Sequence, residues 1–139
     1  MPQFLTMEIQ DYDELCVLWN KTPGITLSAA DSRESIEAYL KRNPGQSFIC
    51  RHQGKLIGSV LCGNDGRRAF LYHMAVEAEF CGQGIGSQLL IKAIEAQAAR
   101  HIDKCALFVL KENDSAISFW QHAGFMPVCE AVTMAKNLS

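Results

Sequence analysis

The sequence lacks any apolar run long enough to cross a bilayer, and it lacks a basic, apolar leader at its start. A membrane-spanning helix needs about 20 consecutive apolar residues, and no stretch of the 139 residues approaches that length. Residues 1–10 include the acidic Glu8 and show no signal-peptide pattern. These absences predict a cytoplasmic protein without a membrane partner.

An excess of charge of one sign is also missing, since the formal net charge is −2. Domains that bind nucleic acid usually carry a basic patch or stripe, so the charge balance argues against a nucleic-acid partner. Hydrophobic residues make up 48% of the chain and charged residues 20%, which is typical of globular proteins. We expect a single domain over residues 1–139, because one core serves a chain of this length.

Clustered cysteines are absent, although the chain has six cysteines. They are scattered and form no Cys-x-x-Cys pair, whereas a structural zinc site needs grouped ligands. Disulfides are rare in the cytoplasm. We therefore predict reduced thiols and no metal. The six are Cys16, Cys50, Cys62, Cys81, Cys105 and Cys129.

Apolar periodicity and turn residues predict the order of secondary-structure elements. Capping patterns predict helices that start at Asp11 and Asp31, a third helix follows Gly86, and a fourth covers 113–122. The nearly continuous apolar run at 105–110 is typical of a strand covered on both faces. Hairpins come first and crossover helices follow, which predicts an α/β (α+β) fold with a mixed, mostly antiparallel sheet and helices on both faces. The expected strands cover 4–9, 47–51, 56–62, 69–76, 105–110, 124–128 and 131–135.

A glycine-rich loop, GQGIG at 82–86, lies between a predicted strand and a predicted helix. Glycine lets the backbone approach a ligand closely, and the first N–H groups of a helix have no partner within it. Together with the helix dipole, they can bind a phosphate without a lysine. Close packing of the helix would account for the glycines equally well.

Two other phosphate-binding motifs fit the loop poorly. A P-loop requires Gly-Lys-Ser/Thr after the glycines, and this chain has no lysine there. A Rossmann fingerprint requires repeated βαβ units and an acidic residue about 20 positions later. Asp103 lies near that distance, but the preceding segment consists of hairpins. The pattern therefore disfavours dinucleotide binding.

Two ordered motifs resemble the GNAT-type N-acetyltransferase superfamily over nearly the whole chain. The first is LYHMAV at 71–76 followed by FCGQGIGSQLL at 80–90, and the second is NDSAISFW at 113–120 followed by GF at 124–125. The resemblance implies the GNAT fold, acetyl-coenzyme A (acetyl-CoA) as donor and coenzyme A as product. It also implies an amine acceptor that attacks the thioester directly.

The resemblance further implies roles for individual residues. The backbone of residues 74–76 would pair with the pantetheine arm, and the Val76 N–H would stabilise an oxyanion. N–H groups of residues 81–87 would hold the pyrophosphate. Asn113 would hydrogen-bond the pantetheine region and also cap the fourth helix. The full expected cofactor-binding set is Met74, Ala75, Val76, Cys81, Gly82, Gln83, Gly84, Ile85, Gly86, Ser87, Asn113, Ser115 and Phe119.

Two positions depart from the family pattern. Cys81 stands where the loop normally opens with Arg or Gln. A thiol at a helix N-terminus can be reactive, but cysteine is among the most buried residue types, so we expect a buried, inert side chain. Trp120 stands where many members have the Tyr that protonates the departing thiolate, and an indole N–H cannot serve as that acid.

The sequence does not assign a general base. Family members often have Glu or His where this chain has Phe70 and Tyr72. Tyr72, with an ordinary pKa of about 10, is better suited to act as an acid or a hydrogen-bond donor. His73 belongs to the residue type that titrates near neutral pH, but strand alternation points it away from the Tyr72 side and favours a structural role. A water chain is the alternative. The expected catalytic residues are therefore Tyr72, Val76 and Trp120.

The predicted function is transfer of an acetyl group to an amine of a small molecule or to an exposed amino group. The acceptor is expected near Trp19, Ile25 and Asp31, and a homodimer is compatible with the sequence. Trp120 and the unassigned base leave a non-catalytic acyl-CoA sensor as one alternative. A phosphate-binding domain unrelated to coenzyme A is the other.

Overall fold

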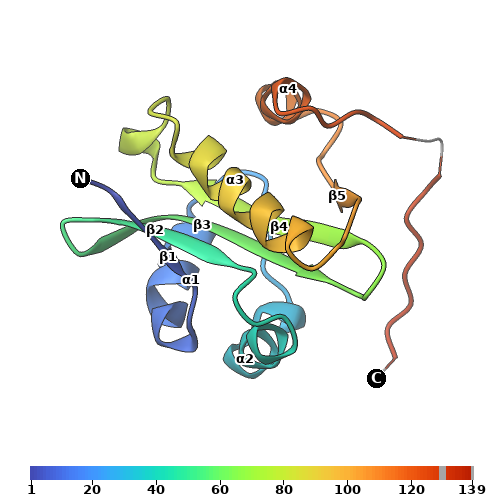
Figure 1. The fold of residues 1–139 in the computed structure, drawn as a ribbon, viewed down its shortest axis with the longest axis horizontal. Coiled ribbons are helices and arrows are strands. Elements are labelled where there is room, and N and C mark those ends of the chain that lie inside the picture. The colour runs from blue at the N-terminus through green and yellow to red at the C-terminus, as the bar shows by residue number, and fades with distance from the viewer. Residues whose placement is uncertain (129–130, 139) are drawn as a thin grey trace.

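A five-stranded sheet runs through the centre of the computed structural model, which describes residues 1–128 and 131–138 (Figure 1). The strands follow one another in space in the order β1-β2-β3-β4-β5. Neighbours from β1 to β4 are antiparallel, and β4 pairs with β5 in parallel. The predicted mixed, mostly antiparallel sheet is confirmed. The strands are β1 (Gln3–Thr6), β2 (Phe48–His52), β3 (Lys55–Asn64), β4 (Ala69–Val76) and β5 (Cys105–Leu107).

Helices cover both faces of the sheet, as the sequence predicts. Helix α3 packs on one face, where Leu89 and Ala93 join a core with Ile57, whereas α1 and α2 pack on the other, where Trp19 and Ile36 join a second core (Figure 1). Since α3 crosses from the end of β4 to the start of β5, it makes that pair parallel. The helices are α1 (Tyr12–Asn20), α2 (Arg33–Arg42), α3 (Ile85–Ala98) and α4 (Asp114–His122), with the 3-10 turns η1 (Ile9–Asp11), η2 (Ala29–Asp31) and η3 (Ala78–Phe80).

The start of α2 differs by one residue from the sequence prediction. Ser32 caps α2, because its side chain accepts a hydrogen bond from the Ser35 N–H. Asp31 instead completes a capping box around η2, in which its carboxylate accepts the Ser28 N–H at 3.1 Å. This reciprocal cap fixes the Asp31 carboxylate against the backbone, although the residue lies in a connection between helices.

The end of the chain departs from the predicted closing strands at 124–128 and 131–135. Residues 125–128 and 131–138 have no regular secondary structure, and Cys129 and Glu130 lie outside the described residues. β5 is also shorter than the predicted strand at 105–110, and Phe108 and Leu110 are exposed rather than covered. An apolar run forms a strand only where a neighbour supplies hydrogen bonds. Within the described part of the chain, β5 pairs with β4 over three residues alone.

No helix of the described residues is both long enough and apolar enough to cross a membrane.

Candidate active site

The edge of β4 that faces β5 is open along its second half. Pairing with β5 spans only Ala69 to Leu71, and beyond them no partner lies on that side among the described residues. The Glu77 N–H donates to the Ile57 carbonyl of β3 at 2.8 Å. Because N–H directions alternate along a strand, the Ala75 N–H also faces β3, whereas those of Met74 and Val76 face the open edge. The geometry therefore leaves Met74 and Val76 free to pair with an added strand, and Ala75 engaged in the sheet.

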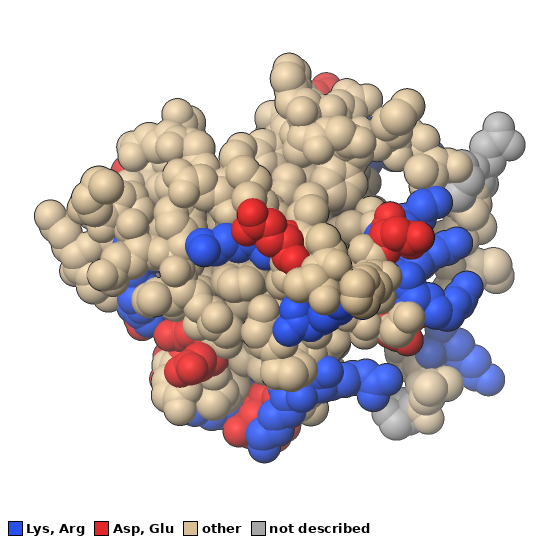
Figure 2. All heavy atoms as spheres, in the orientation of Figure 1, with Lys and Arg blue, Asp and Glu red and all other residues tan. Residues whose placement is uncertain are grey.

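The glycine-rich loop reaches the start of α3 beside this edge. Gly82 and Gly84 both have φ of 82°, in the left-handed region, and Gly84 is the N-cap of α3. A Cβ at either glycine would meet no protein atom within 4 Å. The first turn of α3 carries no acidic residue that would repel an anion. Figure 2 shows charged side chains mainly over the lower and right-hand parts of the face, and few over the start of α3.

The expectation that Cys81 is buried is wrong. Its side chain is exposed, and the thiol lies 3.7 Å from the Val76 carbonyl and 3.6 Å from the Glu77 carbonyl. Residues 81–84 are all exposed, so the loop as a whole lies at the surface and residue 81 with it. Gln83 and Ser87 are exposed as well, whereas the Ile85 side chain belongs to the core and only its backbone faces the loop.

Helix α4 adds a second wall to the glycine-rich loop. The Phe119 ring would lie 3.5 Å from a Cβ placed on Gly86, and the Met74 sulfur would lie 3.9 Å from the same point. Asn113 caps α4 as predicted, because its side-chain oxygen accepts the Ala116 N–H at 3.2 Å, and the Ser115 hydroxyl donates to that oxygen at 3.3 Å. The structure thus brings the start of α3, α4 and the open edge of β4 together.

Trp120, an expected catalytic residue, lies in the core between these elements. Its exposed fraction is 9%, and its ring makes edge contacts with Phe119 at 4.9 Å and Phe125 at 5.3 Å between ring centroids. A ring enclosed in this way supports the neighbouring helix through packing. Its placement favours a packing role over proton transfer.

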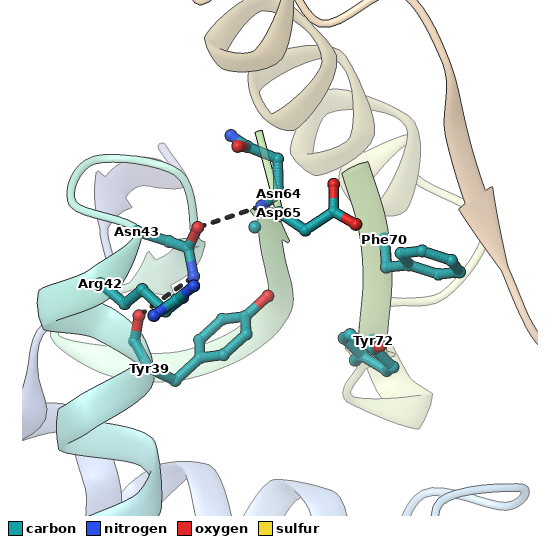
Figure 3. A pocket seen from close by; sticks show the side chains of 8 residues that line it. Tyr39, Arg42, Asn43, Asn64, Asp65, Phe70 and Tyr72 are labelled. Atoms are coloured by element: carbon teal, nitrogen blue, oxygen red, sulfur yellow. Dashed lines mark hydrogen bonds between the residues drawn. The ribbon is translucent and has the colours of Figure 1, made fainter. Parts of the chain in front are cut away.

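On the opposite face of the sheet, two neighbouring cavities lie between α2 and β4. The larger has a volume of about 630 Å³ and extends from η2 along α2 to β4. The smaller, of about 230 Å³, continues toward the β3–β4 turn, and Figure 3 shows Tyr39 and Arg42 of α2 facing Phe70 and Tyr72 of β4 across it. Both cavities share Tyr39, Arg42 and Tyr72, so they form one continuous depression. Asp31, predicted near the acceptor, lines the larger one.

Tyr39 lines both cavities, whereas Trp19 lies in the core next to them. The Tyr39 hydroxyl is buried and has no hydrogen-bond partner among the described residues. Trp19, another residue predicted near the acceptor, is fully buried and supports the cavity from below. The wall of the larger cavity combines apolar side chains, such as Ile36 and Leu61, with polar ones, such as Asp31 and His73, as small-molecule sites do.

His73 points into the same cavity as Tyr72, so the prediction of opposite sides is wrong. Ser59 pairs with Ala75 and Leu61 pairs with Tyr72, which places both His73 and Met74 opposite Val60. This β-bulge inserts one extra residue into β4 and shifts the alternation of its side chains. His73 has φ of 50°, a left-handed conformation that non-glycine residues rarely adopt. Strict alternation holds only for an unbulged strand.

The bulge brings His73 into contact with Asp31, a neighbour that the sequence pattern did not predict. The His73 Nε2 atom lies 2.7 Å from the Asp31 Oδ1 atom. The Trp19 ring stands edge-on to the imidazole, with 4.7 Å between ring centroids. Beneath the bulge, the Trp19 indole N–H donates to the Ser59 hydroxyl at 2.9 Å, and that hydroxyl donates to the His73 carbonyl at 2.9 Å. Side chain and backbone of His73 are both fixed.

Tyr72 lies at the junction of the two cavities, with 41% of the residue exposed. Its ring stacks on Phe70, with 6.3 Å between centroids. Partial burial raises the pKa of the Tyr72 hydroxyl above its ordinary value of 10.0. The group therefore stays protonated at neutral pH and can donate a hydrogen bond, and its role as an acid stays a prediction.

Replacement of Tyr72 tests that role. Tyr72→Phe is expected to lower kcat by about 10- to 100-fold, up to the lower end of the roughly 100- to 10,000-fold contribution of general acid–base catalysis, since water can replace part of the hydroxyl's role. Affinity for acetyl-CoA should be unchanged, because the ring still stacks on Phe70. Steady-state kinetics and calorimetry measure the two quantities. A Tyr72→Phe protein with wild-type kcat would remove the hydroxyl from the reaction, and water would then be the proton source.

Known proteins resemble this chain in both sequence and structure. A model of the acetyltransferase (GNAT) family matches residues 12–125. An acetyltransferase of Pectobacterium atrosepticum is 27% identical over 128 residues, covering 92% of this chain and 89% of the relative. An acetyltransferase of Photorhabdus laumondii is 30% identical over 111 residues, covering 77% and 74%. The crystal structure of PaiA N-acetyltransferase from Thermoplasma acidophilum in complex with coenzyme A superposes with a TM-score of 0.80 at 20% identity, covering 91% and 90%.

Proposed function

The chain belongs to the acetyltransferase (GNAT) family, and from this premise we propose that it acetylates a small-molecule amine bound between α2 and β4. It is an N-acetyltransferase that uses acetyl-CoA as its donor. The observation that carries the proposal is the second half of β4, whose edge on the β5 side has no partner among the described residues. The glycine-rich loop lies at its end and the proposed acceptor cavity on its face.

Acetyl-CoA would lie along the open edge of β4 as an added strand. The N–H groups of Met74 and Val76 both face that edge, and the Met74 N–H supplies a hydrogen bond to the pantetheine arm. The N–H groups at the start of α3, exposed by the glycines, bind the pyrophosphate. Phe119 and the amide of Asn113 border the same path from α4. The thioester then lies near the Val76 N–H, which stabilises the oxyanion that develops on the carbonyl oxygen.

The acceptor amine would occupy the larger cavity. A volume of about 630 Å³ lies in the range of sites for small molecules, about 300–1,000 Å³. Apolar walls from Ile36 and Leu61 suit the carbon skeleton of such a molecule.

The reaction joins the amine nitrogen to the acetyl carbonyl carbon. The nitrogen attacks as a free base, a C–N bond forms, and the negative charge on oxygen is held by the Val76 N–H. Collapse of the intermediate breaks the C–S bond, and the thiolate receives a proton from Tyr72. The nitrogen gives up one proton to become the amide, and that proton restores the Tyr72 hydroxyl. The products are an acetamide and coenzyme A.

A turnover experiment with defined amines tests the proposed function. The protein is incubated with acetyl-CoA and separately with spermidine, lysine, neamine and a short peptide with a free N-terminus, and acetylated products are measured by mass spectrometry. Mass detection is preferable to a thiol reagent, because Cys81 is exposed and would react. We expect acetylation of at least one of the three small amines above the rate of acetyl-CoA hydrolysis without an amine.

The same experiment distinguishes an enzyme from the remaining alternative, a non-catalytic acyl-CoA sensor. Tight binding of acetyl-CoA without any acetylation would favour the non-catalytic sensor. Acetylation of the peptide alone would place the acceptor site outside the cavity, since most of a bound peptide would have to extend beyond the cavity's rim.

A further inference from the structure

We infer that His73 is the residue that takes a proton from the incoming amine, and that Asp31 is the positioning residue that keeps the imidazole ready to do so. The inference rests on the proposed function and assigns the base that the sequence left open. Both residues line the larger cavity and lie 42 positions apart in the chain.

The first argument is the arrangement of the ring nitrogens. Nε2 is 2.7 Å from the Asp31 carboxylate, which is an acceptor and therefore places the proton of a neutral ring on Nε2. Nδ1 then carries the lone pair. No hydrogen bond to Nδ1 is found in the described part of the chain, Nδ1 is not among the buried unpartnered atoms, and 16% of the side chain is exposed. A base that is oriented by a carboxylate has this arrangement.

The second argument is that the Asp31 carboxylate is itself held in place. Its other oxygen accepts the Ser28 N–H at 3.1 Å, and its backbone carbonyl accepts the Tyr12 hydroxyl at 2.6 Å. An orienting group must be fixed if it is to fix the ring.

The third argument is the backbone of His73. A left-handed φ of 50° at a histidine costs free energy, and glycine would avoid that cost. Strain of this kind is common at functional sites, where the surrounding structure holds a side chain in place. Here Trp19 and Ser59 hold the bulge, and its effect is to direct the imidazole into the cavity.

Direct attack on the thioester requires that the acceptor amine first lose a proton. A primary alkyl amine with a pKa of about 10.4 is only about 0.04% neutral at pH 7. The acceptor would bind as an ammonium ion, and His73 Nδ1 would take one of its protons, which leaves a free amine to attack the thioester. After attack, the nitrogen loses a second proton, and the coenzyme A sulfur gains one as the C–S bond breaks. The proton on His73 passes to solvent, so each turnover releases one proton, one acetamide and one coenzyme A.

The groups that face the pair come from four elements. Besides Asp31 of η2 itself, they are Tyr12 from α1, Tyr39 and Arg42 from α2, and Tyr72 from β4. The Lys21–Glu77 ion pair joins the residue after α1 to the residue after β4. The tyrosines are neutral at neutral pH, and burial raises the pKa of Tyr39 further.

The test compares kcat/KM across pH 6 to pH 9.5 for the wild type and His73→Asn, with the small amine that reacts best in the panel above. Asparagine tolerates the left-handed backbone and accepts no proton. At pH 7 we expect a loss of about 100-fold or more. The loss should shrink to within about tenfold near pH 9.5, because the amine then supplies its own free base. His101→Asn is the matched control, since His101 is exposed, has φ of 62° and follows α3.

Asp31→Asn tests the positioning role. An amide N–H facing Nε2 would move the ring proton to Nδ1 and block the base, with a similar loss at pH 7. Asp11→Asn is its control, because Asp11 forms the equivalent capping box around η1. Nitrogen NMR of His73 reads the tautomer directly, and we expect the proton on Nε2 in the wild type and on Nδ1 in Asp31→Asn.

The outcomes separate this inference from the proposed function. A wild type that acetylates an amine, together with a His73→Asn protein whose deficit is absent or equal at all pH values, would overturn the role of His73 and leave the function intact. A wild type that acetylates none of the amines would contradict the function. In that case a wild-type Nδ1–H signal would still overturn the inference, and an Nε2–H signal would still support it.

Discussion

Gly84→Val should weaken acetyl-CoA binding by about 100-fold or more in a protein that still folds. A hydrogen bond to a charged group contributes about 1.5–3 kcal/mol, and each 1.4 kcal/mol is a factor of ten in affinity. Loss of one or two phosphate contacts at the start of α3 therefore has this effect. No protein atom lies within 4 Å of a Cβ at Gly84, so the new side chain would occupy only the space that the phosphates need.

The left-handed backbone of Gly84 requires a matched control, because valine there is strained by about 1–2 kcal/mol or more. Gly54 has φ of 79°, equally open surroundings and a position in the β2–β3 turn. Gly54→Val should lose a comparable amount of thermal stability and keep wild-type affinity. Calorimetry with acetyl-CoA and thermal unfolding measure both effects. Folded Gly84→Val with undiminished affinity would show that the cofactor binds elsewhere.

Val76→Pro should lower kcat by about 100- to 1,000-fold, the loss typical of one missing oxyanion donor. Proline removes the N–H that faces the open edge of β4. It breaks no hydrogen bond to β3, because the neighbouring Glu77 N–H makes that contact. Proline is tolerated at strand edges for this reason. The binding of acetyl-CoA should weaken less than kcat, since the oxyanion exists only during the reaction.

Val76→Ala is the control, because it shortens the side chain and keeps the N–H. Its kcat should stay within about threefold of the wild type, since only packing is lost. Rapid-mixing kinetics at saturating acetyl-CoA compares the two variants. If alanine and proline reduce kcat equally, the side chain of residue 76 matters and the N–H is not the oxyanion donor.

Local sequence signals predicted the elements that carry the cofactor site. The strand–glycine–helix order around Gly84 and the cap at Asn113 depend on neighbouring residues alone, so the chain itself encodes them. The acceptor side was harder to predict. Asp31 and His73 meet only because η2 packs against β4, and neither residue's neighbours indicate the other.

The bulge at His73 had no clear signal in the sequence. Left-handed bulge positions usually hold glycine, and this one holds histidine. A polar ring in the middle of an apolar strand could have suggested a bulge, but regular alternation of side chains was the simpler interpretation. At the other end of the chain, apolar residues at 124–128 and 131–135 matched a strand pattern without a neighbour to pair with. Pairing is a property of the whole fold rather than of a segment.

The division of β4 between an edge and a face has a consequence for how such a protein diverges. In the proposed function its edge, together with the glycine-rich loop and α4, binds the donor through residues from position 74 onward. Its face borders the larger cavity, where the acceptor is proposed to bind, and most of the residues that line this cavity lie at 26–42. Mutations in the earlier segment can therefore alter the choice of amine while the donor is retained. One lineage could thus acquire many acceptors through changes to a stretch of fewer than twenty residues.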